Sequence, residues 1–138
     1  MEDTKKIHLA DDDEDDRTLL KEAFEEIHSG IEVIESEDGK ELIDKLKDEE
    51  DLSDSVIVID MNMPKMNGLE TVKVIKGDPE LADIPTVMLS TSDNPELIKK
   101  AMDVGVDQFL TKPNSFRALI DIAKKIFMRF FSSNKTLL

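Results

Sequence analysis

Residues 56–68 read Val56-Ile57-Val58-Ile59-Asp60-Met61-Asn62-Met63-Pro64-Lys65-Met66-Asn67-Gly68. Four apolar, β-branched residues lead directly to Asp60, and turn-forming residues follow it. An unbroken apolar run bounded by such residues is typical of a strand buried on both faces of a parallel sheet. Asp60 would then lie where the strand meets its loop, which is where open α/β sheets bind ligands. By itself, this carboxylate could be a nucleophile, a metal ligand or a helix cap.

The rest of the chain alternates between strand and helix patterns around this stretch. Short apolar runs at 7–10, 31–35, 86–90 and 106–111 are typical of strands. Apolar positions at helical spacing follow each run, beginning near Leu19, Leu42, Gly68, Pro95 and Ser115. The glutamates within 31–35 favour a strand at the edge of the sheet. We therefore predict an α/β fold with one doubly wound, five-stranded parallel sheet and helices on both of its faces.

Composition excludes several classes of protein. The length of 138 residues predicts a single domain over 1–138, with a core of about 5–131 and a patternless tail at 132–138. A net charge of −14 argues against binding to nucleic acid, whose phosphates require clustered lysine and arginine. Without cysteine there is no disulfide, thiolate nucleophile or cysteine-based zinc site. No signal peptide and no apolar run of about 18 residues is present, so we predict a cytoplasmic protein that does not span a membrane.

Polar residues gather at the ends of four predicted strands. Asp11 and Asp12 follow the first, Asp60 ends the third, Ser90 ends the fourth and Lys112 follows the fifth. Three carboxylates in one crevice repel one another unless a cation binds, and oxygen ligands favour Mg²⁺ or Mn²⁺. A lysine and a hydroxyl suit the oxygens of a phosphoryl group. A carboxylate flanked by a metal and a lysine can attack phosphorus. The pattern therefore predicts phosphoryl transfer to Asp60.

These residues resemble the receiver domains of two-component response regulators. The resemblance rests on residues 7–13, on 59–64 with Gly68, on Leu89-Ser90 and on 109–113, and it spans about residues 5 to 130. It implies a flavodoxin-like sheet of order 2-1-3-4-5, the order of the family's chemotaxis member, with the second strand remote from the site. It also implies a single-domain regulator without an attached output domain.

The resemblance implies a role for each acid. Asp60 accepts a phosphoryl group from the phosphohistidine of a sensor histidine kinase or a phosphotransfer protein. Asp12 binds Mg²⁺ directly and Asp11 assists largely through water. Asp60 and the backbone carbonyl of Asn62 complete the protein's ligands, and Gly68 belongs, with the preceding proline, to the turn that holds this carbonyl near the metal.

The resemblance also implies a switch. Lys112 pairs with the phosphoryl oxygens beside a cis bond to Pro113, which proline makes accessible. Ser90 turns toward the phosphoryl group and Phe109 follows it inward, which reshapes the face of the fourth helix, fifth strand and fifth helix. An unknown downstream protein, or a second copy of the chain, would bind that face. Ser90 replaces the commoner threonine and keeps the hydroxyl, whereas Phe109 replaces a frequent tyrosine and loses the ring hydroxyl.

The chain's C-terminal turns suggest a further contact. Phe131 with Met128 could form an exposed apolar patch, which would favour a homodimer. Four other acids, at positions 13–16, are expected to form a solvated turn that is favourable at a helix N-terminus.

Three alternatives fit the sequence less well. An EF-hand fits the acids from Asp11 onward, but its sixth position requires glycine and is Asp16 here, and a strand precedes it. A phosphatase of the haloacid dehalogenase type uses similar groups, but its nucleophile follows the first strand and a second aspartate lies two residues later, where this chain has Asn62. A receiver-like fold that no longer takes phosphate is disfavoured because the complete set of site residues is present.

Overall fold

The computed structural model describes residues 4–63 and 66–131. Five strands alternate with five helices along them: β1 (Lys5–Ala10), α1 (Glu14–Ile27), β2 (Ile31–Ser36), α2 (Gly39–Asp48), β3 (Ser55–Asp60), α3 (Gly68–Lys76), β4 (Thr86–Ser90), α4 (Pro95–Asp103), β5 (Gln108–Thr111) and α5 (Phe116–Phe130). All strand pairs are parallel, and the order is β2-β1-β3-β4-β5. The predicted fold class and strand order are confirmed.

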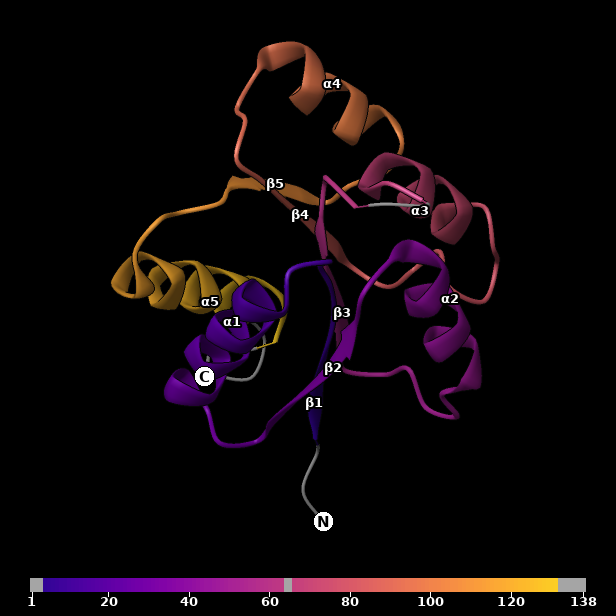
Figure 1. The fold of residues 1–138 in the computed structure, drawn as a ribbon. Helices are drawn as coiled ribbons and strands as arrows, with labels where there is room; N and C mark the ends of the chain where they lie inside the picture. Colours follow the sequence, from indigo (N-terminus) through magenta and orange to yellow (C-terminus); the bar gives the residue numbers. More distant parts are fainter. Residues whose placement is uncertain (1–3, 64–65, 132–138) are drawn as a thin grey trace, which may run out of the picture.

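Helices cover both faces of this sheet (Figure 1). α1 and α5 lie on one side, and α2 and α3 lie on the other. Side chains of a strand alternate between the two faces, and β3 shows this directly. Val56 and Val58 join the core beneath α1 and α5, while Ile57 and Ile59 join the core on the opposite face. Every residue of β3 is buried, so the predicted central strand delivers Asp60 to the carboxyl edge of the sheet.

The helix starts explain several polar residues of the sequence. Each N-cap side chain accepts a backbone hydrogen bond that the first turn would otherwise lack; the caps are Asp13, Asp38, Asn67, Asn94 and Ser115. Asp13 accepts from the backbone N–H groups of Asp15 and Asp16. This cap starts α1 at Glu14, ahead of the first apolar position at Leu19. The acidic run is therefore the capped first turn of a helix, where negative charge is stabilising.

Two predictions about the C-terminal third are corrected. β5 is shorter than the predicted 106–111, because the N–H of Val106 donates to the carbonyl of Ala101 in α4 and the pairing with β4 begins at Gln108. The apolar patch of Phe131 and Met128 is also wrong, since Phe131 is only 8% exposed whereas Met128 is 63% exposed. The Phe131 ring packs on Phe127, with ring centroids 5.6 Å apart. The tail at 132–138 lies outside the described residues.

Gly68 allows the loop after β3 to fold back on the strand end. Its N–H donates to the carbonyl of Met61 at 2.9 Å. A Cβ at this position would lie 2.8 Å from the carbonyl oxygen of Asp60 and 2.9 Å from the Cα of Met61. These atoms belong to the backbone, so they cannot turn aside as a flexible side chain would. The close approach therefore requires glycine.

We predict that Gly68→Ala lowers the free energy of unfolding by about 1–3 kcal/mol, the usual cost of overpacking. Gly77→Ala is the matched control, because the nearest atom to its added Cβ would be 3.3 Å away and its φ of −86° suits alanine. Urea unfolding of both variants measures the difference. Equal losses would contradict the steric role of Gly68.

Candidate functional site

Three carboxylates meet at the carboxyl edge of the sheet. Asp11 follows β1 and Asp60 ends β3, and both residues are buried, with exposed fractions of 3% and 7%. Asp12 is exposed beside them. Each of the three offers a carboxylate oxygen, and these oxygens lie within 4.8 Å of one another. The convergence predicted from separate strand ends is therefore present in the fold.

The positive charge of Lys112 does not fully offset the burial and mutual repulsion of the carboxylates in this cluster. Burial raises the pKa of Asp60 to about 6, and the neighbouring Asp11 raises it as well, against the opposing effect of Lys112. Burial also raises the pKa of Asp11. Ionised carboxylates held this close and this deeply are stabilised by a cation. Oxygen ligands at this separation suit a hard divalent ion, so these residues could hold one.

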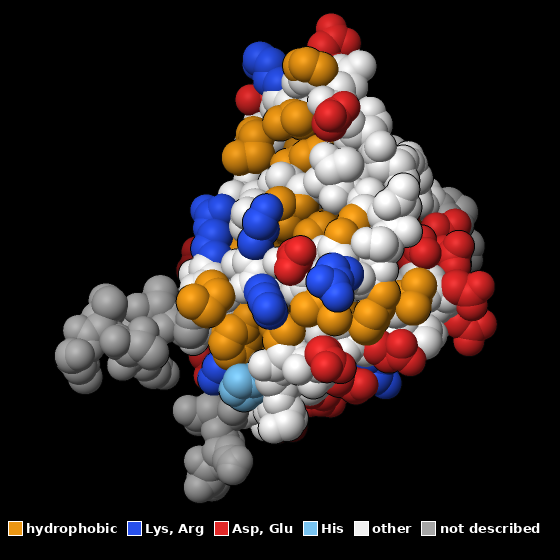
Figure 2. Space-filling view, turned by 90° about the vertical axis from the view of Figure 1, so that its left-hand side faces the viewer, with side chains coloured by type: hydrophobic (Ala, Val, Ile, Leu, Met, Phe, Trp, Pro, Cys, Tyr) orange, Lys and Arg blue, Asp and Glu red, His pale blue; other side chains and the backbone are white. Residues whose placement is uncertain are grey.

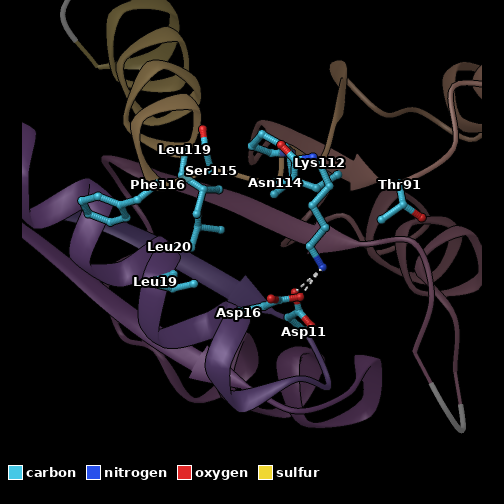
Figure 3. A pocket seen from close by; sticks show the side chains of 12 residues that line it. Asp11, Asp16, Leu19, Leu20, Thr91, Lys112, Asn114, Ser115, Phe116 and Leu119 are labelled. Atoms are coloured by element: carbon cyan, nitrogen blue, oxygen red, sulfur yellow. Dashed lines mark hydrogen bonds and ion pairs between the residues drawn. The ribbon is translucent and has the colours of Figure 1, made fainter.

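Lys112 reaches the cluster from the turn after β5 (Figure 3). Its Nζ lies 2.9 Å from Oδ2 of Asp11, 2.8 Å from Oδ2 of Asp16 and 3.5 Å from Oδ1 of Asp60. Burial alone would lower the pKa of Lys112, but hydrogen bonds to Asp16 and Asp11 raise it above its ordinary value. Lys112 is therefore protonated at neutral pH, and its ammonium group lies beside the carboxylates, as predicted. Its contact with Asp16 had not been predicted from the sequence.

The predicted switch residues lie on the two strands next to the cluster. Ser90 is fully buried at the end of β4, and its Oγ accepts a hydrogen bond from the N–H of Ser92 at 3.0 Å. Phe109 is half-buried on β5, opposite Met88, and packs against the core on the α2 and α3 side. Among the described residues, no hydrogen bond joins the Ser90 hydroxyl to Asp60, whose carboxylate accepts from Lys112.

Asn62 lies on the other side of the cluster. Together with Asp12, Met63 and Asn67 it surrounds an open cavity of about 480 Å³. Asn62 and the carboxylate-bearing Asp12 therefore line the same cavity. Gly68 starts α3 at the end of this loop, and Pro64, the other predicted turn residue, lies outside the described residues.

The predicted cis bond before Pro113 is wrong for this structure. Among the described residues no peptide bond is cis. The trans form is favoured for a bond before proline by about 0.5–1 kcal/mol. Lys112 reaches Asp11 from this trans arrangement, so the position of its ammonium group does not require the cis bond.

Arg17 also supports the site and was missed in the sequence. Its guanidinium donates to the backbone carbonyl of Asp11 at 2.8 Å and to Oε1 of Glu35 at 3.0 Å. Glu35 lies on β2, the strand predicted to be remote from the chemistry. β2 therefore contributes indirectly, by anchoring the arginine that holds the end of β1. One signal was available, because Arg17 is the sole basic residue within 11–20.

A groove runs from Lys112 along α1 and the start of α5. Its volume is about 370 Å³, and its apolar lining includes Leu19, Leu20, Phe116 and Leu119. Figure 3 shows these side chains on one side of Lys112, with the carboxylates of Asp11 and Asp16 below its tip. The face of α1 and α5 shows hydrophobic side chains in patches among lysine and arginine (Figure 2). The site therefore borders a surface suited to protein contact.

The sequence profile of the response regulator receiver domain matches residues 7–124. The chain belongs to this family. A chemotaxis protein CheY homolog of Campylobacter jejuni subsp. jejuni is 32% identical over 108 residues, which cover 78% of this chain and 81% of that protein. The crystal structure of the phosphorylated cyanobacterial phytochrome response regulator RcpA has a TM-score of 0.83 and 34% identity, covering 94% of this chain and 96% of that one. The Mn²⁺-bound response regulator Rcp1 has a TM-score of 0.78 and 28% identity, with the same coverage.

Membership of this family decides between the predicted functions. The chain is a signalling receiver domain, and the acidic pocket of Asp11, Asp12 and Asp60 is consistent with phosphorylation and a divalent metal. The haloacid dehalogenase alternative is not supported. Receiver domains of response regulators interact with histidine kinases and with downstream effectors. Within the described ranges, no helix is long and apolar enough to cross a membrane.

Proposed function

We propose that Asp60 accepts a phosphoryl group from the phosphohistidine of a sensor histidine kinase or a phosphotransfer protein. The observation that carries this proposal is the meeting of three carboxylates within 4.8 Å, with Lys112 Nζ 3.5 Å from Asp60. The relatives RcpA and Rcp1, described as phosphorylated and as Mn²⁺-bound respectively, support it.

The transfer uses groups that the chain itself provides. A carboxylate oxygen of Asp60 forms a new bond to phosphorus while the phosphorus–nitrogen bond of the donor histidine breaks, and the imidazole leaves with that electron pair and takes up a proton. Asp60 must be ionised to attack, which its pKa of about 6 permits at neutral pH. Lys112 offers its ammonium protons to the phosphoryl oxygens, where negative charge is concentrated.

Mg²⁺ is the cofactor that we propose for this reaction, with Mn²⁺ as a substitute. Asp12, Asp11, Asp60 and the backbone carbonyl of Asn62 would hold it, Asp11 largely through water. Bound there, the ion would neutralise charge on the carboxylates and on the transferred group. The crowding of ionised acids within 4.8 Å supports this assignment, because it creates a site that a divalent cation relieves.

Phosphorylation would then change a protein-binding surface. Ser90 would leave the N–H of Ser92, turn toward the phosphoryl group and vacate space for Phe109. The two residues lie on adjacent strands, and the ring of Phe109 is only half-buried, so it can become more deeply buried. The face of α4, β5 and α5 would be remodelled for a downstream protein or for a second copy of the chain.

Acetyl phosphate with Mg²⁺ tests this function directly. We expect one phosphoryl group per chain by mass spectrometry, as an adduct that hydroxylamine removes, and we expect chelation of the metal to prevent it. Asp60→Ala should give no adduct, whereas Asp83→Asn, which removes an exposed acid elsewhere, should behave as the unsubstituted protein.

Three outcomes would contradict the proposal. Rapid repeated hydrolysis of phosphate monoesters would indicate a phosphatase. An adduct that persists in Asp60→Ala would place the acceptor elsewhere. Complete absence of an adduct would show that the fold no longer takes phosphate.

A further inference from the structure

Asp16 has no part in the proposed reaction, yet it makes the shortest contact to Lys112. The Nζ–oxygen distance is 2.8 Å, compared with 3.5 Å for the acceptor Asp60. Asp16 lies in the first turn of α1 and does not belong to the metal-competent cluster. Among the described residues, Lys112 is the sole side chain within ion-pair distance of its carboxylate. The ion pair with Lys112 is therefore its direct contact with the charged groups of the site.

The three acids around Lys112 compete for one ammonium group. Its protons serve as the donors, and the two shorter contacts are to Asp11 and Asp16 on the α1 side. The side chains of Asp11 and Asp60 are 4% and 8% exposed, whereas that of Asp16 is 40% exposed. Figure 3 shows Lys112 directed at the Asp11 and Asp16 carboxylates. The lysine is therefore drawn away from the acceptor in the unphosphorylated protein.

A phosphoryl group on Asp60 would reverse this balance. It replaces one negative charge on the acceptor by about two and adds strong acceptor oxygens. Lys112 Nζ lies 2.8 Å from Asp16 and 3.5 Å from Asp60, so a closer contact with a phosphoryl group on Asp60 competes with its contact to Asp16. Weakening of the Asp16 contact then opposes engagement of the phosphoryl group by Lys112.

We propose that Asp16 is a positioning residue that holds Lys112 toward α1 and thereby restrains phosphorylation of Asp60. This inference rests on the proposed function of Asp60 and adds a regulator of its rate. The restraint that we propose is exerted through the ion pair with Lys112, so it must disappear when that lysine is absent.

The test compares Asp16→Asn with Asp15→Asn. Both variants remove one negative charge from the same exposed helix turn, but Asp15 makes no ion pair with Lys112 among the described residues. With acetyl phosphate and Mg²⁺, we expect Asp16→Asn to raise the initial phosphorylation rate about two- to fivefold above Asp15→Asn, the size that a partly exposed ion pair supports. In a Lys112→Met background the two variants should be equal.

A second measurement does not depend on phosphorylation. In the metal-free protein, the nitrogen-15 NMR signal of the Lys112 ammonium should shift in Asp16→Asn relative to Asp15→Asn, because the Asp16 carboxylate lies 2.8 Å from this nitrogen. Equal chemical shifts in the two variants would overturn the ion pair itself.

The outcomes separate this inference from the function on which it rests. If the unsubstituted protein takes no phosphoryl group, the proposed function fails and the inference fails with it. If that protein is phosphorylated but Asp16→Asn is no faster than Asp15→Asn, the inference alone fails. A rate difference that survives in Lys112→Met would also overturn it, because Asp16 would then act by another route.

Discussion

Replacing Asp60 with asparagine is expected to stabilise the metal-free protein by about 2–3 kcal/mol at pH 7. The Asp60 carboxylate is buried near Asp11, and its pKa is raised from 3.8 to about 6. At neutral pH the folded protein must keep this group ionised in an unfavourable place. Asparagine has nearly the same shape without the charge, so the variant escapes that cost.

The dependence on pH follows from the direction of the shift. Because the pKa of Asp60 is higher in the folded protein than in the unfolded chain, the folded protein binds more protons between pH 3.8 and about 6. The contribution of Asp60 to the free energy of unfolding therefore falls as the pH rises from 3.8 to about 6. The advantage of Asp60→Asn should be absent below about pH 4 and complete above about pH 6.

Urea unfolding of Asp60→Asn and of the unsubstituted protein, both with a chelator present, measures the difference in free energy of unfolding. In thermal unfolding, the melting temperature of Asp60→Asn should be higher by about 5–10 °C. Asp83→Asn is the control for loss of an exposed acid. Adding Mg²⁺ or Mn²⁺ should stabilise the unsubstituted protein more than Asp60→Asn, since the cation binds the ionised carboxylate. If Asp60→Asn were no more stable than Asp83→Asn, the carboxylates would not repel one another as the proposed metal site requires.

His8 is expected to make the fold sensitive to acid, by about 3 kcal/mol between pH 6.5 and 4. The side chain is buried within β1, at 1% exposure, and its Nε2 lies 3.1 Å from Oγ of Ser55. Its Nδ1 has no hydrogen-bond partner among the described residues. Burial lowers the pKa of His8 to about 4, because there is little to stabilise a charged ring.

The sign is opposite to that of Asp60. The unfolded chain binds a proton on this histidine below about pH 6.5 while the folded protein does not, so the contribution of neutral His8 is complete above that pH and is lost as the pH falls toward 4. His8→Gln keeps a group able to hydrogen-bond Ser55 but cannot be protonated. We expect its stability to decline less than that of the unsubstituted protein over this range.

Two measurements check this prediction. Urea unfolding at a series of pH values compares His8→Gln with the unsubstituted protein, and the ring-proton NMR signal of His8 reports its titration, with His28→Gln used to assign the second histidine signal. A midpoint near 6.5 for His8, or parallel stability profiles, would show that burial does not govern this residue. Because Asp60 and His8 act in opposite directions, Asp60→Asn should also steepen the acid loss.

The residues at the predicted strand ends identified the members of the site, but they did not reveal which further side chains contact them. Asp11, Asp12, Asp60 and Lys112 converge because parallel strands place their carboxyl ends at one edge, which follows from the topology alone. Asp16 and Arg17 were missed because they belong to a helix turn, whose side-chain directions depend on how α1 packs against α5 and β2. The bond before Pro113 was assigned by resemblance and proved to be trans.

By itself, the sequence determined the alternation of strands and helices, the buried strand 56–60 that ends in Asp60, and the charged groups of a predicted phosphoryl-transfer site. Local patterns fix these features because burial and turn formation depend on neighbouring residues. Only the tertiary structure decided that Lys112 is shared among Asp11, Asp16 and Asp60, and that Arg17 ties β2 to the end of β1. Those contacts join residues far apart in the chain, so their distances and the pKa of Asp60 arise from packing.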